Sequence, residues 1–202
     1  MTVVDDIVVR RLGRVAYSPT LAAMRRFTLE RDEATSDELW LLEHPAVYTL
    51  GQGATPVQVA NGIAVIAADR GGEVTYHGPG QVVLYTLVDL GRRGIKVKQF
   101  VHLLEQAVID LIGPHAARRA GAPGVYVDDA KVAALGIRVT RGRAYHGLAL
   151  NVDMDLTPFS AIDPCGYPGL RVTQTRDLGI NAAPAELGER LAGLVVRALD
   201  HA

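Results

Sequence analysis

Residues 124–152 read GVYVDDAKVAALGIRVTRGRAYHGLALNV, and this stretch decides the fold. The runs GVYV, KVAALGIRVT and RAYHGLALNV are rich in β-branched, aromatic and other apolar residues, as extended strands are. Asp128-Asp129-Ala130 joins the first two runs and Arg141-Gly142 joins the last two, and both links suit tight turns. Residues 124–152 are therefore predicted to form a β-meander.

Further extended segments precede the meander. Residues 82–90, VVLYTLVDL, are apolar or β-branched almost throughout, which is typical of a central strand buried on both faces. Residues 62–68, GIAVIAA, predict a short buried strand. Residues 38–50, ELWLLEHPAVYTL, predict an extended stretch that a His-Pro turn interrupts. The glycine-rich segment 70–81, RGGEVTYHGPGQ, is expected to turn tightly.

Helical periodicity predicts helices over residues 18–31, 98–112 and 184–200. The first has Ser18 as a candidate N-cap and Pro19 in the first helical position. No internal repeat or low-complexity linker divides the 202 residues. We therefore expect one mixed α/β (α+β) domain over residues 1–202.

Composition excludes several classes of function. A net charge of −1 argues against a nucleic-acid-binding protein that works through a general basic field. No segment has the roughly 20 uncharged apolar residues that span a bilayer, and the N-terminus MTVVDDIVVRR lacks the pattern of a secretory signal. We therefore expect a cytoplasmic protein that does not enter membranes. A single cysteine excludes an internal disulfide, and the histidines lack close paired spacing, so we predict no metal site.

The positive charges occur in pairs of adjacent arginines. The pairs are Arg10-Arg11, Arg25-Arg26, Arg92-Arg93 and Arg118-Arg119. They are interpreted either as solvated surface or, if several pairs share one face, as a docking surface for an acidic protein partner.

The single cysteine, Cys165, is the first candidate for chemistry. A lone cysteine is usually a small buried hydrophobe. This one lies in a proline- and glycine-bearing loop, residues 156–173, within the segment Asp163-Pro164-Cys165-Gly166. Loops held by rigid neighbours commonly display functional groups, but a thiol is mostly protonated at neutral pH and needs a partner to become a nucleophile.

Lys131 and His77 are the candidate bases. Small apolar residues follow Lys131, so its amine could be partly desolvated and act as a base, although a hairpin lysine that points into water is the alternative. His77 lies in the glycine-rich segment, whose backbone amides could bind an anion or an oxyanion. That segment matches neither common phosphate-binding glycine motif, so no ATP site of those kinds is indicated. His146 is interpreted as an ordinary strand histidine.

Four segments together resemble one family, the lipoyl(octanoyl) transferases of lipoate biosynthesis. They are RGGEVTYHGPGQ (70–81), APGVYVDDAKVAALGIRV (122–139), HGLALNVDMDL (146–156) and IDPCGYPGL (162–170). They occur in the family's order with compatible spacing, and the resemblance covers roughly residues 40 to 175. It implies a fold similar to the catalytic domain of lipoate and biotin protein ligases, a mixed β-sheet flanked by helices.

The resemblance also implies an activity and a site. The octanoyl group of octanoyl-acyl carrier protein would pass through a thioester on Cys165 to a lysine of a lipoyl domain, in the E2 subunits of 2-oxoacid dehydrogenases or in the glycine cleavage H protein. Cys165 matches the nucleophile, Lys131 matches its general base, and no metal or other cofactor is implied. The segments that match the acyl site contain Arg70, Gly71, Gly72, Glu73, Val74, Thr75, Tyr76, His77, Ala134, Leu135, Gly136, Gly147, Leu148 and Ala149.

Two rival functions remain open. An ATP-dependent lipoate ligase would share the fold and the acceptor, but it would activate free lipoate as an adenylate and would not need Cys165. A module that binds carrier protein or lipoyl domains without catalysis would not need both Cys165 and Lys131. Transfer by a Cys165→Ala variant that depends on ATP would favour the ligase, and tight carrier binding without acyl exchange would favour the module.

Overall fold

The computed structural model describes residues 7–55, 59, 61–162 and 169–202. Within these residues the centre of the molecule is a seven-stranded sheet with the strand order β1-β2-β6-β10-β9-β8-β7. Strands β1 and β2 pair in parallel and the other neighbours pair antiparallel, so the sheet is mixed. In this order the strands are β1 (Val8–Arg14), β2 (Glu38–Glu43), β6 (Gln81–Asp89), β10 (Arg143–Asn151), β9 (Ala130–Thr140), β8 (Gly124–Val127) and β7 (Ala116–Arg118).

The predicted meander is confirmed as strands β8, β9 and β10. Asp128 and Asp129 have backbone φ angles of 47° and 64° in the first turn, and Arg141 and Gly142 have φ angles of 52° and 78° in the second. Two consecutive positive φ values are what a tight two-residue hairpin turn requires. The local sequence thus fixes both hairpins.

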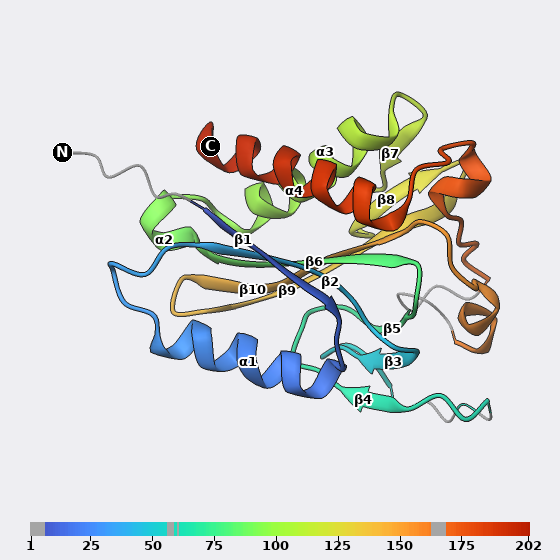
Figure 1. Cartoon of the computed structure of the whole chain (residues 1–202), viewed down its shortest axis with the longest axis horizontal. Helices are drawn as coiled ribbons and strands as arrows, with labels where there is room; N and C mark the ends of the chain where they lie inside the picture. The colour runs from blue at the N-terminus through green and yellow to red at the C-terminus, as the bar shows by residue number, and fades with distance from the viewer. Residues whose placement is uncertain (1–6, 56–58, 60, 163–168) are drawn as a thin grey trace.

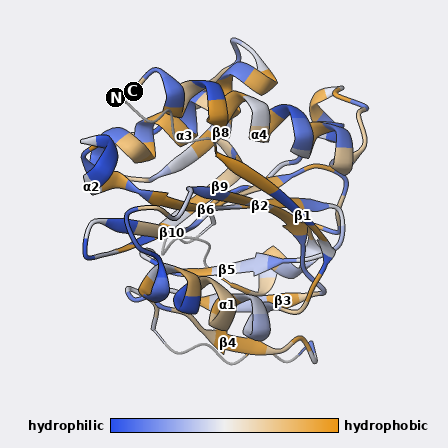
Figure 2. Cartoon of the chain, turned by 60° about the vertical axis from the view of Figure 1, so that its left-hand side comes forward, coloured by the Kyte–Doolittle hydropathy of each residue, from blue (hydrophilic) through white to orange (hydrophobic). Residues whose placement is uncertain are grey.

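Helices cover the two faces of the large sheet unequally (Figure 1). Helices α3 (Val97–Ile112) and α4 (Pro184–Asp200) pack against each other on one face, and α1 (Tyr17–Glu30) lies on the opposite face across β10. Hydrophobic residues concentrate on the inner strands, while the outer surfaces of the helices are largely hydrophilic (Figure 2). The predicted mixed sheet flanked by helices is therefore confirmed.

The predicted first helix is displaced by a residue or two. It begins at Tyr17 after Ala16, with no side-chain cap, so Ser18 and Pro19 lie inside its first turn. The helix buries Leu21, Met24 and Thr28 on one stripe, as the periodicity predicted, and Tyr17 is buried as well. Packing of this stripe on the sheet therefore decides where the helix begins, and the local capping signal does not.

A small second sheet lies beside α1. It has the order β4-β3-β5 and consists of β4 (Val65–Ala67), β3 (Val47–Leu50) and β5 (Val74–His77). The His-Pro turn at residues 44–45 separates β2 from β3 and sends them into different sheets. Strands β1, β5 and β7 were not predicted. The sequence analysis placed β5 inside a glycine-rich turn, where its short run of β-branched residues was overlooked.

The remaining elements are short. They are helix α2 (Leu90–Arg93) and the 3₁₀ turns η1 (Thr157–Ala161) and η3 (Thr175–Leu178). The paired arginines are distributed over several elements, and in each pair at least one guanidinium binds a carboxylate. The pair 10–11 binds Glu38 and Glu189, the pair 25–26 binds Asp69, the pair 92–93 binds Asp37, and the pair 118–119 binds Glu105 and Asp129. These contacts favour a role in the fold over a shared docking surface.

Candidate active site

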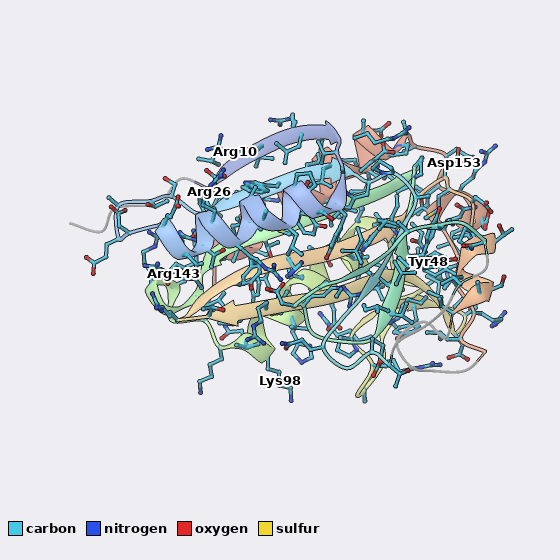
Figure 3. The ribbon with its side chains drawn as sticks, turned by 90° about the horizontal axis from the view of Figure 1, so that it is seen from below. Arg10, Arg26, Tyr48, Lys98, Arg143 and Asp153 are labelled. Atoms are coloured by element: carbon cyan, nitrogen blue, oxygen red, sulfur yellow. The ribbon has the colours of Figure 1, made fainter. Side chains whose placement is uncertain are left out.

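A pocket lies between the large sheet, helix α1 and the segment around β5. Strands β6, β9 and β10 form its floor, and the residues that follow β4 together with β5 form one wall. Seen from below, α1 crosses this face of the sheet, and Tyr48 of β3 lies beyond the helix (Figure 3). The pocket is lined by Tyr17, Arg70, Gly72, Glu73, Val74, Thr75, His77, Val83, Tyr85, Ala134, Leu135, Gly136, His146, Gly147, Leu148 and Ala149.

Strand pairing brings the predicted acyl-site segments together. Ala134 lies opposite Ala149, and Gly136 lies opposite Gly147, across the β9–β10 hairpin. Two of the predicted residues do not line this pocket. Gly71 lines a neighbouring groove and donates its N–H to the Ile137 carbonyl at 3.0 Å, and Tyr76 packs its ring against Phe159.

Glycine at two floor positions keeps the pocket open. A Cβ on Gly147 would lie 2.1 Å from the Leu84 carbonyl oxygen, so a side chain there would force the backbone to move. A Cβ on Gly136 would lie 3.0 Å from the Gly71 carbonyl oxygen and 3.2 Å from the Arg70 side chain. These glycines therefore permit a close approach between strands and loop as well as leaving space for a ligand.

Arg70 holds the wall of the pocket in place. Its Nη2 donates to the Thr49 carbonyl at 2.7 Å and to the Thr49 hydroxyl at 2.8 Å, and its Nη1 donates to the Gly71 carbonyl at 3.0 Å. These bonds tie the glycine-rich segment to β3. The Arg70 side chain therefore holds the glycine-rich segment in place as one wall of the pocket.

Lys131 is buried, contrary to the alternative of a hairpin lysine that points into water. Only 3% of its surface is exposed, and its Nζ donates to the Pro123 carbonyl at 3.1 Å and lies 5.2 Å from the centre of the Tyr126 ring. A bulge in β9 causes this placement, because Tyr126 pairs with Lys131 where a regular ladder would pair it with Val132. Val132 and Ala133 both pack in the core under α3 and α4, and Lys131 is not among the residues that line the pocket.

The chain that follows Cys165 is attached to Lys131. The Lys131 N–H donates to the Arg171 carbonyl at 2.8 Å, and the Thr173 N–H donates to the Lys131 carbonyl at 2.9 Å. Lys131 also pairs in parallel with Val172. Cys165 itself, with the rest of 163–168, lies outside the described residues, so its predicted role stays a prediction. Both described ends of this loop, Ile162 and residues 171–173, are nevertheless held in the fold.

The sequence analysis did not identify Tyr17, Val83, Tyr85 or His146 as pocket residues, although all four line it. Val83 and Tyr85 alternate with core-facing Val82 and Leu84, so strand periodicity within 82–90 could have assigned them to the pocket face. Tyr17 comes from the helix that crosses this face. Its placement depends on tertiary packing.

Buried histidines line or support the pocket. Burial lowers the pKa of His44, lowers that of His77 to about 3, and lowers that of His146. His44 bridges the Val15 carbonyl and the Tyr85 hydroxyl at 2.6 and 2.7 Å, and His77 Nδ1 lies 2.7 Å from the Gln81 amide oxygen. The three imidazoles are therefore neutral at neutral pH.

His146 differs from the ordinary strand histidine that was predicted. It has a φ angle of +63° in the middle of β10. In a regular strand, Tyr145 and His146 would point to opposite faces, yet their rings stack 5.0 Å apart and both bind the Asp69 carboxylate. The positive φ turns the imidazole onto the pocket face. A non-glycine residue held in this conformation marks a place where function is worth seeking.

Asp69 is the anchor of this arrangement. Its carboxylate accepts hydrogen bonds from His146 Nε2 at 2.8 Å, the Tyr145 hydroxyl at 2.6 Å and Arg25 Nε at 2.8 Å. Burial raises its pKa, but these donors outweigh burial and hold the pKa of Asp69 well below its usual range. An ionised carboxylate only accepts hydrogen bonds, so Nε2 of His146 carries the ring proton and Nδ1 is a bare acceptor.

A family model described as the lipoyl protein ligase A/B catalytic domain matches residues 16–193. The chain belongs to this family. The resemblance found in the four sequence motifs is thus confirmed.

Curated relatives and solved structures agree with the family match. The chain is 59% identical to an octanoyltransferase of Thiobacillus denitrificans, over 96% of this chain and 91% of the relative. It is 55% identical to an octanoyltransferase of Dechloromonas aromatica, over 96% of this chain and 97% of the relative. On this evidence the chain is an acyltransferase.

The solved structures show the fold. A bipartite lipoate protein ligase from Thermoplasma acidophilum matches with a TM-score of 0.72 at 16% identity, covering 96% of this chain and 84% of that one. A biotin protein ligase from Aquifex aeolicus, in complex with biotin and ATP, matches with a TM-score of 0.60 at 12% identity, covering 95% and 70%. The predicted similarity to lipoate and biotin protein ligases is confirmed.

Among the described residues, no group of three or more histidine, cysteine or acidic side chains could hold a metal ion. In the same residues, no helix is long and apolar enough to cross a membrane.

Proposed function

We propose that this acyltransferase moves an octanoyl group from octanoyl-acyl carrier protein to a lysine of a lipoyl domain, through a thioester on Cys165. The acceptors would be the lipoyl domains of 2-oxoacid dehydrogenase E2 subunits and of the glycine cleavage H protein. The proposal includes a single catalytic domain over residues 1–202 and a cytoplasmic location. Relatives named octanoyltransferases, 55–59% identical over nearly the whole chain, support the octanoyl cargo.

The observation that carries the proposal is the placement of Lys131. Its amine is buried next to Gly124, which pairs with the pocket residue Ala134, and its backbone binds the segment that follows Cys165. Cys165 precedes Arg171 by six residues, and six extended residues span at most about 20 Å, so this length of chain allows the thiol to reach Lys131. A buried amine near a thiol is a plausible arrangement for nucleophilic catalysis, because the amine can take the thiol proton.

The reaction would proceed in two halves. Lys131 takes the proton from Cys165, the thiolate attacks the octanoyl thioester carbonyl, and the proton passes to the departing carrier thiol. The acceptor lysine then loses a proton to Lys131 and attacks the Cys165 thioester, which forms an amide and releases the thiolate. The apolar floor of Ala134, Gly136 and Ala149 would hold the octanoyl chain in both halves.

The geometry favours Lys131 over His77 as the base. His77 has a pKa lowered to about 3 by burial, and Gln81 occupies its Nδ1. An imidazole with so low a pKa is a weak base at neutral pH. His77 would therefore shape the pocket wall.

Intact-protein mass spectrometry tests the proposal. Incubation with octanoyl-acyl carrier protein, without ATP, should add the mass of one octanoyl group, and peptide mapping should place it on Cys165. Adding an apo-lipoyl domain should then discharge the enzyme and acylate the domain. A Cys165→Ala variant is the matched control and should stay unmodified.

Other outcomes would contradict the proposal. Efficient transfer without any acylation of Cys165 would exclude the covalent route. Transfer by Cys165→Ala that requires ATP and free lipoate or octanoate would indicate a ligase. Tight carrier binding with no acyl exchange would indicate a binding module.

A further inference from the structure

Two polar atoms inside the pocket make no hydrogen bond of good geometry with a described residue, although the Thr49 hydroxyl lies close enough to the Tyr17 hydroxyl to lower its pKa. They are the hydroxyl of Tyr17 and Nδ1 of His146, and these residues are only 3% and 1% exposed. Both residues line the mostly apolar pocket. A buried polar atom without a partner is costly, so such atoms usually meet water or a ligand.

Tyr17 and His146 lie at one end of the pocket, grouped around Tyr85. The Tyr17 ring packs against His44 with centroids 5.2 Å apart, and His44 and His146 contact the Tyr85 ring at 5.8 and 6.0 Å. The Tyr17 ring also stacks on His77, with centroids 6.0 Å apart. The hydrogen bond to Asp69 and the positive φ of His146 fix the orientation of the imidazole ring. The unprotonated Nδ1 is therefore held in one position in the pocket wall.

This end is displaced from Lys131 by about the length of an octanoyl group. The Lys131 amine lies beside Gly124, whose Cβ position is 3.2 Å from Nζ, and Gly124 pairs with Ala134. His146 pairs with Ile137, three residues farther along β9, which is roughly 10 Å along the strand. An extended octanoyl group has seven carbon–carbon bonds of about 1.5 Å and spans roughly 9 Å as a zigzag.

We propose that Tyr17 and His146 form a polar stop that limits the acyl chain to about eight carbons. The inference rests on the proposed function and adds the residues that set its selectivity. Water would occupy this end of the pocket and pair with the Tyr17 hydroxyl and with His146 Nδ1. An octanoyl chain ends before the water, whereas a longer chain displaces it and leaves both polar atoms buried against methylene groups.

The test compares acyl carriers of different length. For the wild type and a Tyr17→Phe variant, kcat/KM for transfer to an apo-lipoyl domain is measured with hexanoyl, octanoyl and decanoyl carrier protein. Tyr17→Phe keeps the ring and removes the hydroxyl, so the decanoyl-to-octanoyl ratio should rise roughly five- to tenfold. His146→Asn, a residue that tolerates a positive φ, should shift the same ratio in the same direction.

A matched control separates selectivity from general damage. Tyr48→Phe removes a buried hydroxyl that is paired with the Pro158 carbonyl at 2.7 Å and lies outside the pocket lining, so it should not change the ratio. If both pocket variants fold and their ratios stay within about twofold of the wild type, the polar stop is refuted while octanoyl transfer stands. If the wild type is not acylated by octanoyl carrier protein, the proposed function fails and the stop fails with it.

Discussion

Asp37 is the residue whose substitution should most damage the fold. Its carboxylate is fully buried next to the start of β2 and receives hydrogen bonds from Arg31 Nη2 at 2.7 Å, Arg92 Nη2 at 2.9 Å, Arg93 Nε at 2.6 Å and the Asp89 N–H at 2.8 Å. Arg31 follows the last turn of α1, so the cluster attaches that helix to the large sheet. Tyr17 belongs to the same helix.

Asp37→Asn keeps the shape but removes the carboxylate that these three guanidinium groups share. The Arg31 side chain is 1% exposed and that of Arg93 is 12% exposed, so water cannot fully replace the lost partner. Removing one partner of a buried ion pair typically destabilises a protein by about 3 to 5 kcal/mol. For a chain of this size the melting temperature should fall by roughly 6–20 °C.

Differential scanning calorimetry at pH 7 measures this effect, with Glu189→Gln as the control. Glu189 binds Arg11 in an exposed pair, and its loss should leave the melting temperature nearly unchanged. A fall of less than about 2 °C for Asp37→Asn would refute the assignment of this cluster as a structural anchor.

The acid dependence gives an independent check on Asp37. Burial raises its pKa, but the Asp89 N–H, Arg93 and Arg31 outweigh burial, and the folded pKa lies below the usual value of about 3.9. Asp37 therefore contributes stability above about pH 4, and this contribution is lost as the pH falls through the folded pKa. The Asn variant should lack that component of the acid transition.

Three further predictions concern the pocket. Lys131→Met keeps an apolar stem without the amine and should slow octanoyl acylation roughly 10²–10⁴-fold in quenched-flow mass spectrometry, whereas a larger loss for His77→Gln would reverse the assignment of the base. Gly147→Ala should lower both the melting temperature and octanoyl transfer, because its Cβ would lie 2.1 Å from the Leu84 carbonyl oxygen. Gly193→Ala on α4 is the control and should lower neither, because its Cβ would lie 3.6 Å from the Arg197 side chain. Burial lowers the pKa of His77 to about 3 in the folded protein, whereas in the unfolded chain it is about 6.5. As the pH falls below about 6.5, His77 therefore binds a proton in the unfolded chain but not in the folded one, and the free energy of unfolding should fall by up to about 1.4 kcal/mol per pH unit. His77→Gln should reduce that slope in thermal melts between pH 7.5 and 5, and an unchanged slope would contradict the buried neutral imidazole.

Much of the fold was predictable because its signals are local. The meander at 124–152, the central strand at 82–90 and the helices at 98–112 and 184–200 depend on periodicity and turn residues, and the structure places them within a residue or two. The family followed from four motifs in order. The pairing of the pocket segments 134–136 and 147–149 was also predictable, because a short hairpin joins β9 to β10 and sets their register.

Other features depend on contacts between distant segments. Whether Lys131 points to water or into the protein is decided by a bulge opposite Tyr126, and hydrophobic alternation does not reveal where a ladder gains a residue. Tyr17 and His146 meet in the pocket wall only because α1 crosses β10, and these two residues are 129 positions apart in the chain. Asp69, which binds the imidazole of His146 at its positive φ, is more than 70 positions away. Local sequence was enough to predict the meander, the central strand and the helices, since these depend on neighbouring residues, but it did not reveal strands β1, β5 and β7. Only the tertiary structure decided which side chains face the ligand, because orientation follows from packing between elements far apart in the chain.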